Sequence, residues 1–260
     1  ANTAYRWRPG VKGAEVYLKP SGQLTPQPGF RETGSNGLAR DPQGRLLLCQ
    51  HGERRVARWE NERFTVLADR FEGRRFNSPN DLAVRRNGEV YFTDPPYGLE
   101  GVDRSPLREI PFHGVYRVTP AGEVSLLTKE IRFPNGIAFS PAEDILYVAV
   151  SDGAATRVMA YDVRPDGGVA NPRVFFNAQP LRAPGVRGGC DGLKVDREGN
   201  VWTTGPGGVL VISREGRLLG RLNTFEPTAN CAWGDDGSTL YIAANYFLVR
   251  VRTLTKGAGW

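Results

Sequence analysis

Pairs of short apolar runs, joined by tight turns, recur along the whole chain. In one such pair Leu82–Val84 is followed by the turn at Asn87-Gly88 and then by Val90–Phe92. Short runs of β-branched and aromatic residues between turn residues predict β-strands. No helical periodicity is sustained beyond a turn or two, so the pattern predicts an all-β protein built of short, tightly connected strands.

A repeated phrase opens each pair of runs: Asn or Asp, then usually Gly or Asp, then an aliphatic pair. Its copies begin at Asn36, Asn80, Asn135, Asp191 and, in a degenerate form, Asn230, at intervals of 44, 55, 56 and 39 residues. A third and a fourth strand are expected after each pair, for example Gly114–Val118 and Val124–Leu127. A four-strand unit at this spacing is typical of one blade of a β-propeller.

The first residues fit the same pattern with one part missing. Asn2–Arg8 is expected to be a third strand and Glu15–Leu18 a fourth, without an inner phrase before them. Counting this incomplete first blade predicts a six-bladed β-propeller that forms a single domain over residues 1–260. We expect the missing strands to lie upstream of Ala1, together with any targeting segment. The compartment stays open between cytoplasm and periplasm.

A radial array brings equivalent positions of all blades to a central axis. Asn80, Asn135 and Asp191 are therefore expected to meet there, and each hairpin should return a polar residue beside them: Thr93-Asp94 by Asn80, Ser151-Asp152 by Asn135, Thr203-Thr204 by Asp191, Asn245 by Asn230 and His51 by Asn36. Side-chain oxygens suit Ca²⁺ or Mg²⁺, and Ca²⁺ better. The alternative is that Asn-Gly and Asp-Gly are simply turn dipeptides.

Composition narrows the choice of partners. The formal net charge is +6, but the basic residues are mostly Arg spread along the chain rather than clustered as a phosphate-tracking surface requires. No apolar run approaches a membrane span. We therefore expect neither nucleic acid nor membrane as partner. The three cysteines are expected to be buried apolar groups, with one bridge between Cys190 and Cys231 conceivable.

Four segments resemble the motifs of bacterial gluconolactonases in the SMP-30/gluconolactonase/luciferin-regenerating family of six-bladed propellers. They are Arg75–Val84 (RFNSPNDLAV), Tyr91–Gly98 (YFTDPPYG), Phe133–Ile137 (FPNGI) and Cys190–Asp196 (CDGLKVD). The resemblance covers essentially the whole chain from Asn2. It implies a hydrolase that opens a sugar lactone to an aldonic acid.

The resemblance also implies a ligand set. Asn135 matches the family's Asn ligand of a divalent cation, Asp191 its Asp ligand, and Asn80 an Asn on the substrate side that also serves as a ligand. Ca²⁺ fits best, with Mg²⁺, Zn²⁺ or another ion left open. The family's Glu ligand lies in a Glu-Gly-Pro phrase of the first inner strand, and this sequence has no such phrase.

The implied mechanism is attack of water on a cation-polarised lactone carbonyl, with Asp191 positioning or deprotonating the water. Asn80, Tyr97, Arg75 and His51 are candidate substrate contacts. The alternatives are a backbone-bonded rim residue for His51 and an exposed loop residue for Arg75. The loop between Asp94 and His113 is expected to cover the mouth of the pocket.

Three other functions remain open. An organophosphate or aryl-ester hydrolase would use the same site with an apolar pocket, whereas Asn77, Asp94 and His51 favour a sugar. A non-catalytic propeller would serve as an interaction platform. A strictosidine-synthase-like lyase would need a Glu base on a late blade, for which there is no good candidate. Nucleophilic Ser catalysis is rejected because no His completes Ser151-Asp152 and no Gly-x-Ser-x-Gly elbow exists. A monomer or dimer is expected.

Overall fold

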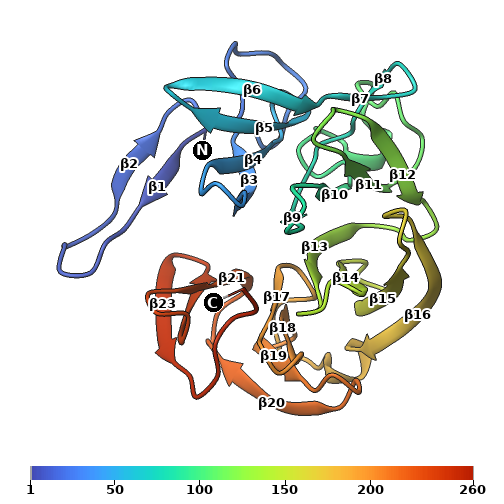
Figure 1. Ribbon diagram of the computed structural model, residues 1–260. Helices are drawn as coiled ribbons and strands as arrows, with labels where there is room; N and C mark the ends of the chain where they lie inside the picture. Colours follow the sequence, from blue (N-terminus) through green and yellow to red (C-terminus); the bar gives the residue numbers. More distant parts are fainter. Residues whose placement is uncertain (1, 260) are drawn as a thin grey trace. The chain divides into compact units, whose positions relative to one another are not determined.

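The computed structural model describes residues 2–259, which form β-strands joined by turns and two short 3₁₀ helices, η1 (Val102–Arg104) and η2 (Gln179–Leu181). The predicted domain boundaries, residues 1 and 260, lie outside this part. The chain divides into two compact units, Ala1–Glu130 and Ile131–Trp260, and each is described by itself. Figure 1 labels the strands of both units.

The first unit contains two four-stranded antiparallel sheets in which neighbouring strands follow one another along the chain. The first is β3 (Ser35–Arg40), β4 (Leu46–Gln50), β5 (Arg55–Glu60) and β6 (Arg63–Ala68); the second is β9 (Leu82–Val84), β10 (Val90–Asp94), β11 (Gly114–Val118) and β12 (Val124–Thr128). A small hairpin of β7 (Arg70–Phe71) and β8 (Arg74–Arg75) links them. This meander order is that of propeller blades.

The residues of the expected incomplete blade form a two-stranded antiparallel sheet, β1 (Ala4–Arg6) and β2 (Glu15–Leu18). Its inward side chains Ala4 and Leu18 pack with Leu48 of β4, and Trp59 and Phe64 lie against this cluster. The predicted third and fourth strands are therefore found, and they are anchored on the following sheet by apolar burial.

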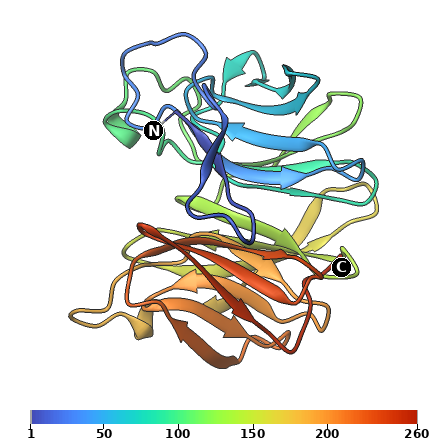
Figure 2. The same ribbon diagram turned by 90° about the vertical axis from the view of Figure 1, so that its left-hand side faces the viewer.

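The second unit contains three sheets with the same strand order (Figure 1; Figure 2). They are β13 (Pro134–Phe139), β14 (Ile145–Val150), β15 (Arg157–Val163) and β16 (Val169–Asn177); β17 (Leu193–Val195), β18 (Val201–Gly205), β19 (Gly208–Ile212) and β20 (Leu218–Asn223); and the three-stranded set β21 (Thr228–Gly234), β22 (Thr239–Ala244) and β23 (Phe247–Arg252). The chain is thus an all-β propeller. Within residues 2–259 five blades have three or four strands, so five of the six predicted blades are found.

The core of the first unit holds an aromatic cluster close to the predicted site. Phe76 is fully buried, and its ring centroid lies 5.1 Å from that of Phe92 and 5.0 Å from that of Tyr116, both in edge-to-face geometry. Such pairs add about 0.5–1.5 kcal/mol beyond the burial of their surface. They fix the backbone just before Asn77, where the site begins.

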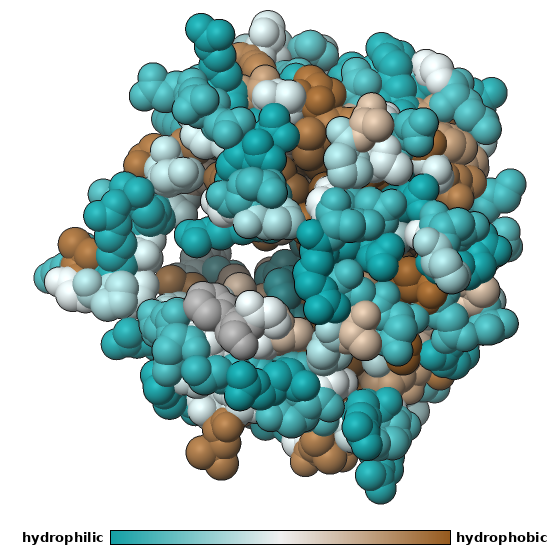
Figure 3. Space-filling view, viewed as in Figure 1, coloured by the Kyte–Doolittle hydropathy of each residue, from teal (hydrophilic) through white to brown (hydrophobic). Residues whose placement is uncertain are grey.

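The surface agrees with the composition. The face seen in Figure 3 is mostly hydrophilic, with apolar residues scattered over it. Within the described residues no helix is long and apolar enough to cross a membrane. Cys49, Cys190 and Cys231 are buried free thiols, so the bridge considered between the last two is absent.

Candidate active site

The repeated Asn-Gly and Asp-Gly phrases lie where inner strands of neighbouring sheets touch. The amide of Gly37 donates to the carbonyl of Asn80 at 2.7 Å, and the amide of Gly136 donates to the carbonyl of Asp191 at 3.0 Å. A Cβ on Gly136 would lie 2.3 Å from that Asp191 oxygen, and one on Gly37 would lie 2.6 Å from Asn80 O. Glycine is needed for this close approach.

The interpretation of these phrases as turns is wrong for the first and third copies. Gly37 and Gly136 lie inside β3 and β13, at register shifts between Ser35 and Leu38 and between Pro134 and Ile137. The extra residues of a bulge re-aim a side chain at a strand end. In the second unit this arrangement brings the Asn135-Gly136 segment against the backbone of Asp191.

The Asn135 amide is fixed in orientation by Ser151. The Ser151 hydroxyl donates to the carbonyl of Cys190 at 2.5 Å, so its oxygen accepts the 2.8 Å hydrogen bond from Asn135 Nδ2. Because a hydroxyl has one proton to donate, the nitrogen of the amide must face Ser151 and the Oδ1 carbonyl must face the other way. Asn135 is 5% exposed, and the predicted neighbourhood of Ser151 and Asn135 is confirmed.

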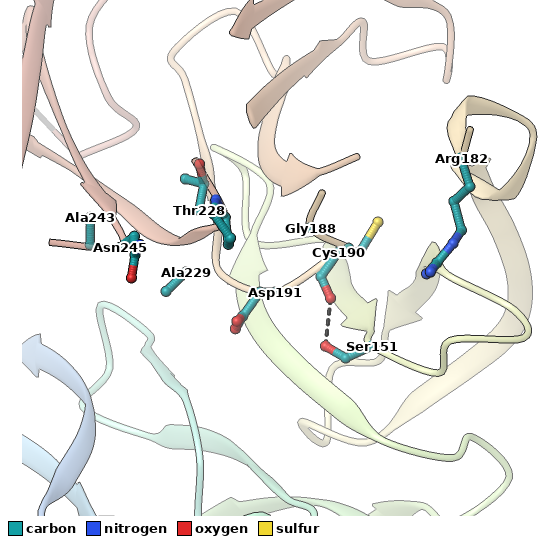
Figure 4. A pocket seen from close by; sticks show the side chains of 11 residues that line it. Ser151, Arg182, Gly188, Cys190, Asp191, Thr228, Ala229, Ala243 and Asn245 are labelled. Atoms are coloured by element: carbon teal, nitrogen blue, oxygen red, sulfur yellow. Dashed lines mark hydrogen bonds between the residues drawn. The ribbon is translucent and has the colours of Figure 1, made fainter. Parts of the chain in front are cut away.

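Asp191 lies at the edge of a pocket of about 440 Å³ in the second unit. Its amide donates to Thr204 Oγ1 at 2.9 Å, which confirms the predicted pairing with the Thr203-Thr204 hairpin end. Figure 4 shows its carboxylate projecting away from Ser151. The pocket is lined by Ser151, Arg182, Gly188, Gly189, Cys190, Asp191, Pro227, Thr228, Ala229, Ala243 and Asn245. Arg182 directly follows η2 on an irregular segment, and no motif or repeat in the sequence pointed to it.

Asn80 belongs to the first unit and is 3% exposed. Its amide donates to the carbonyl of Thr93 at 2.8 Å, so the predicted hairpin return of Thr93-Asp94 is confirmed. Its side-chain Oδ1 is buried and accepts no hydrogen bond from the described residues. An unsatisfied buried acceptor costs about 1–3 kcal/mol and indicates a functional partner. An oxygen held in this way suits a hard cation or a substrate hydroxyl.

His51 is buried, at 1% exposure, rather than placed on a rim. Its Nδ1 lies 3.2 Å from Glu32 Oε2, and its Nε2 is buried without a hydrogen-bond partner among the described residues. The hydrogen bond from His51 lowers the pKa of the Glu32 carboxyl, with burial acting in the opposite direction. The ring is thus oriented by a carboxylate and not by the backbone.

Arg75 ends the short strand β8 and Tyr97 lies on a loop of the first unit, and both are partly buried. The Arg75 guanidinium donates to the carbonyl of Glu53 at 2.7 Å, and its amide donates to Glu109 Oε2 at 2.8 Å. Arg75 therefore joins two loops and is not the freely exposed residue of the alternative. Tyr97 belongs to the long loop after Asp94, which contacts residues 29–32 through the hydrogen bonds from Arg31 and Glu32 amides to Gly98 O.

Asn77 and Asp94 are fully buried, and both bind backbone groups; Asn77 Oδ1 also lies 3.4 Å from Arg108 Nε. Asn77 Nδ2 donates to Phe112 O at 2.9 Å, and Asp94 accepts the amides of Asn77 and Ser78, each at 2.8 Å. Burial raises the pKa of Asp94 to about 7 against these two hydrogen bonds and the nearby charges of Arg54 and Arg108. The expectation that both face a sugar is wrong.

The donor chemistry fits a cation held mainly by neutral oxygens. Among residues 2–259 there is no group of three or more His, Cys, Asp and Glu side chains that could hold a metal ion. The two amides and one carboxylate of the predicted set are instead oxygen donors, and the Asn80 carbonyl is the orphaned one. Ca²⁺ and Mg²⁺ take such oxygens.

Comparison with known proteins matches the chain to the "SMP-30/Gluconolactonase/LRE-like region" family over residues 2–246. A gluconolactonase of Zymomonas mobilis is 38% identical over 99% of this chain and 74% of its own length. The gluconolactonase XC5397 of Xanthomonas campestris has a solved structure with a TM-score of 0.74 and 35% identity, over 85% of this chain and 72% of that one. A second solved structure, assigned as a gluconolactonase, has a TM-score of 0.84 and 29% identity, over 100% of this chain and 83% of that one.

Proposed function

Because the chain belongs to the SMP-30/gluconolactonase/LRE-like family, we propose that it is a lactonase that hydrolyses a sugar lactone such as glucono-1,5-lactone to the aldonic acid. The observation that carries the proposal is the backbone contact that brings the Asn135-Gly136 segment to Asp191, a residue that lines the pocket of the second unit. Ser151 accepts the hydrogen bond from Asn135 Nδ2, so the Asn135 carbonyl faces away from Ser151. Asp191 supplies a carboxylate at the pocket.

Asn135, Asp191 and Asn80 are the proposed ligands of a divalent cation, with Ca²⁺ preferred because all three offer oxygen. Such an ion would polarise the lactone carbonyl and counter the charge that develops on its oxygen. Two of the three donors are neutral, and the family's Glu-Gly-Pro phrase is absent from this sequence. Cation affinity is therefore expected to depend strongly on Asp191.

Asp191 is the proposed catalytic residue. It orients a water for attack on the lactone carbonyl carbon, and the bond between this carbon and the ring oxygen breaks. One proton of the water ends on the former ring oxygen, and the other is released to solvent as the new carboxylic acid ionises. The products are the open-chain hydroxyl and the carboxylate. Asn80, Tyr97, Arg75 and His51 are proposed on the substrate side. The support is that His51 Nε2 and Asn80 Oδ1 are buried and have no hydrogen-bond partner in the part of the chain that the structure describes.

Architecture is part of the proposal. We take both units as one domain with β1 and β2 as the outer strands of a sixth blade, because they have the order and spacing of a third and fourth strand. The long loop between Asp94 and His113 is proposed to cover the site.

The test is lactone opening measured with and without a chelator. Asp191→Ala and treatment with EDTA should each lower kcat/KM for gluconolactone by about 10²-fold or more. Asp166→Ala, which removes an exposed turn carboxylate paired with Arg164, is the matched control and should leave the rate unchanged. Activity that survives both EDTA and Asp191→Ala would remove the metal mechanism.

Initial rates on gluconolactone, an alkyl lactone and an organophosphate then separate the substrate classes. The proposal expects gluconolactone to be the best substrate. Preference for the organophosphate would favour the phosphotriesterase alternative, and no turnover of any of the three would favour an interaction module.

A further inference from the structure

We propose that Arg54 and Asp94 are positioning residues that aim the Asn80 side chain by holding the segment Arg75–Asn80 from its two sides. The inference rests on the proposed function, because it explains how the Asn80 side chain, a proposed ligand there, is held in place. Both charged groups lie in the first unit, and neither has a part in the reaction proposed above.

The end of β10 binds the amides that lead to Asn80. Asp94 Oδ2 accepts the amide of Asn77 and Oδ1 that of Ser78, each at 2.8 Å. One residue earlier, Thr93 accepts the amide of Asn80 through its carbonyl, at 2.8 Å. Pro79 has no amide proton to offer. Every amide from Asn77 to Asn80 that can donate is thus bound by one of two adjacent residues.

Arg54 binds the carbonyls at the other end of the segment. Its Nε donates to Phe76 O at 2.6 Å, and a terminal nitrogen lies 3.3 Å from Arg75 O. A second terminal nitrogen pairs with Glu109 at 3.3 Å. The Phe76 ring is locked in the aromatic cluster of the core. The segment is therefore held by backbone carbonyls at its start and by backbone amides toward its end.

Burying both side chains costs free energy, and precise placement of a site residue is a function that would explain this cost. Asp94 is 0% exposed and Arg54 is 3% exposed. Buried charges lose several kcal/mol of hydration, and an apolar packing of similar volume is often more stable. Here both side chains hold one segment, which ends at Asn80 Oδ1, an acceptor that binds no donor among residues 2–259. A site residue held in this way is preorganised for a ligand.

The decisive test is a double-mutant cycle between Asp94→Asn and Asn80→Ala. Asparagine keeps the volume of Asp94 but turns one acceptor into a donor, which opposes the amide of Asn77 or Ser78. Asp94→Asn alone should lower kcat/KM for gluconolactone about 10- to 100-fold, as loss of an outer support commonly does. In the Asn80→Ala background, Asp94→Asn should lower kcat/KM by a further factor of less than about three, because its effect acts through Asn80.

Asp196→Asn is the matched control. Asp196 is equally buried and accepts the amides of Glu198 and Asn200 with one oxygen, but it lies in the turn between β17 and β18. It should lower the melting temperature as Asp94→Asn does and leave kcat/KM within about twofold. If Asp94→Asn does not fold, Arg54→Lys replaces it in the same cycle, since Lys keeps the charge but cannot fork to two carbonyls.

Hydrogen exchange gives a readout without activity. Exchange across residues 75–81 should rise in Asp94→Asn and stay unchanged in Asp196→Asn. The positioning role would be overturned if the losses of kcat/KM in the two single variants multiplied in the double variant. It would also be overturned by faster exchange with unchanged kcat/KM, or by an Asn80→Ala variant with wild-type kcat/KM. A wild-type protein that opens no lactone would instead refute the proposed function, while the exchange result would still decide whether Asp94 holds the segment.

Discussion

Asp94 is surrounded by groups that act on its proton in opposite directions. The amides of Asn77 and Ser78 and the charges of Arg54 and Arg108 favour the carboxylate, and complete burial favours the neutral acid. Burial is the larger effect, so the pKa of Asp94 rises from its ordinary value to about 7. Asp94 thus keeps a proton in the folded protein over a range in which the unfolded chain has lost it.

This difference predicts how stability changes with pH. Between about pH 4 and pH 7 the folded state binds more protons at Asp94, so its contribution is fully present below about pH 4 and is lost as the pH rises through about 7. The slope is at most about 1.4 kcal/mol per pH unit. Urea unfolding at pH 5 and pH 8 should show a smaller pH dependence in Asp94→Asn than in the wild type. The same dependence in both proteins would contradict the assignment to Asp94.

Ser151 offers a residue-scale test of the Asn135 geometry. Ser151→Ala removes the acceptor that holds Asn135 Nδ2, so the amide can rotate and its carbonyl loses its fixed direction. We expect kcat/KM to fall about 10-fold and the free energy of unfolding to fall by about 1 kcal/mol. Steady-state kinetics and urea titration measure the two effects.

Ser140→Ala is its control. The Ser140 hydroxyl binds Asp144 and two amides in the turn between β13 and β14, so its loss should cost similar stability. Turnover should not change, because this turn lies at the other end of β13 from Asn135. Equal losses of turnover in both variants would mean that Ser151 acts through stability alone.

At the scale of strands, the contact between β13 and the residues before β17 depends on Gly136. A methyl group there would lie 2.3 Å from Asp191 O, which is backbone and cannot move aside cheaply. Gly136→Ala should therefore cost about 1–3 kcal/mol of stability and lower kcat/KM by separating Asn135 from Asp191. Gly220→Ala, on the outer strand β20 with nothing within 4 Å, should be neutral or slightly stabilising. Thermal melts and kinetics compare the two, and wild-type turnover in a folded Gly136→Ala would count against the paired site.

Strand positions followed from the sequence wherever alternation and turn residues agreed. Gly114–Val118 was predicted with its observed bounds, and the predicted Val124–Leu127 is one residue shorter than β12. Repeats also placed Ser151 by Asn135 and Thr204 by Asp191, because hairpin closure is local.

The supports of the site did not follow from the sequence. Arg54 lies 22 residues before Phe76, whose carbonyl it binds, and nothing in the local sequence shows that this Arg is buried while its neighbour Arg55 is partly exposed. Which charges are buried depends on packing between distant segments, which one sequence does not encode in any short pattern. Asp94 was noticed as a polar residue, but its role was misread for the same reason.

The properties of the whole molecule bear on the cation. Its net charge of +6 repels cations at long range, so the attraction must come from local oxygens. At physiological salt, exposed charges are screened beyond about 8 Å, so this repulsion should weaken cation binding only modestly. A ligand that binds only the folded state stabilises it by about 2.7 kcal/mol at 100 times its Kd.

Calcium should therefore raise the melting temperature of the wild type in a saturable way, and EDTA should reverse the rise. Asp191→Asn removes the one charged donor of the proposed set and should abolish the saturable part, whereas Asp166→Asn, at an exposed turn paired with Arg164, should retain it. NaCl at matched ionic strength separates binding from screening. A rise of equal size in Asp191→Asn would place the ion elsewhere, because the neutral amides of Asn80 and Asn135 offer no substitute for the lost carboxylate.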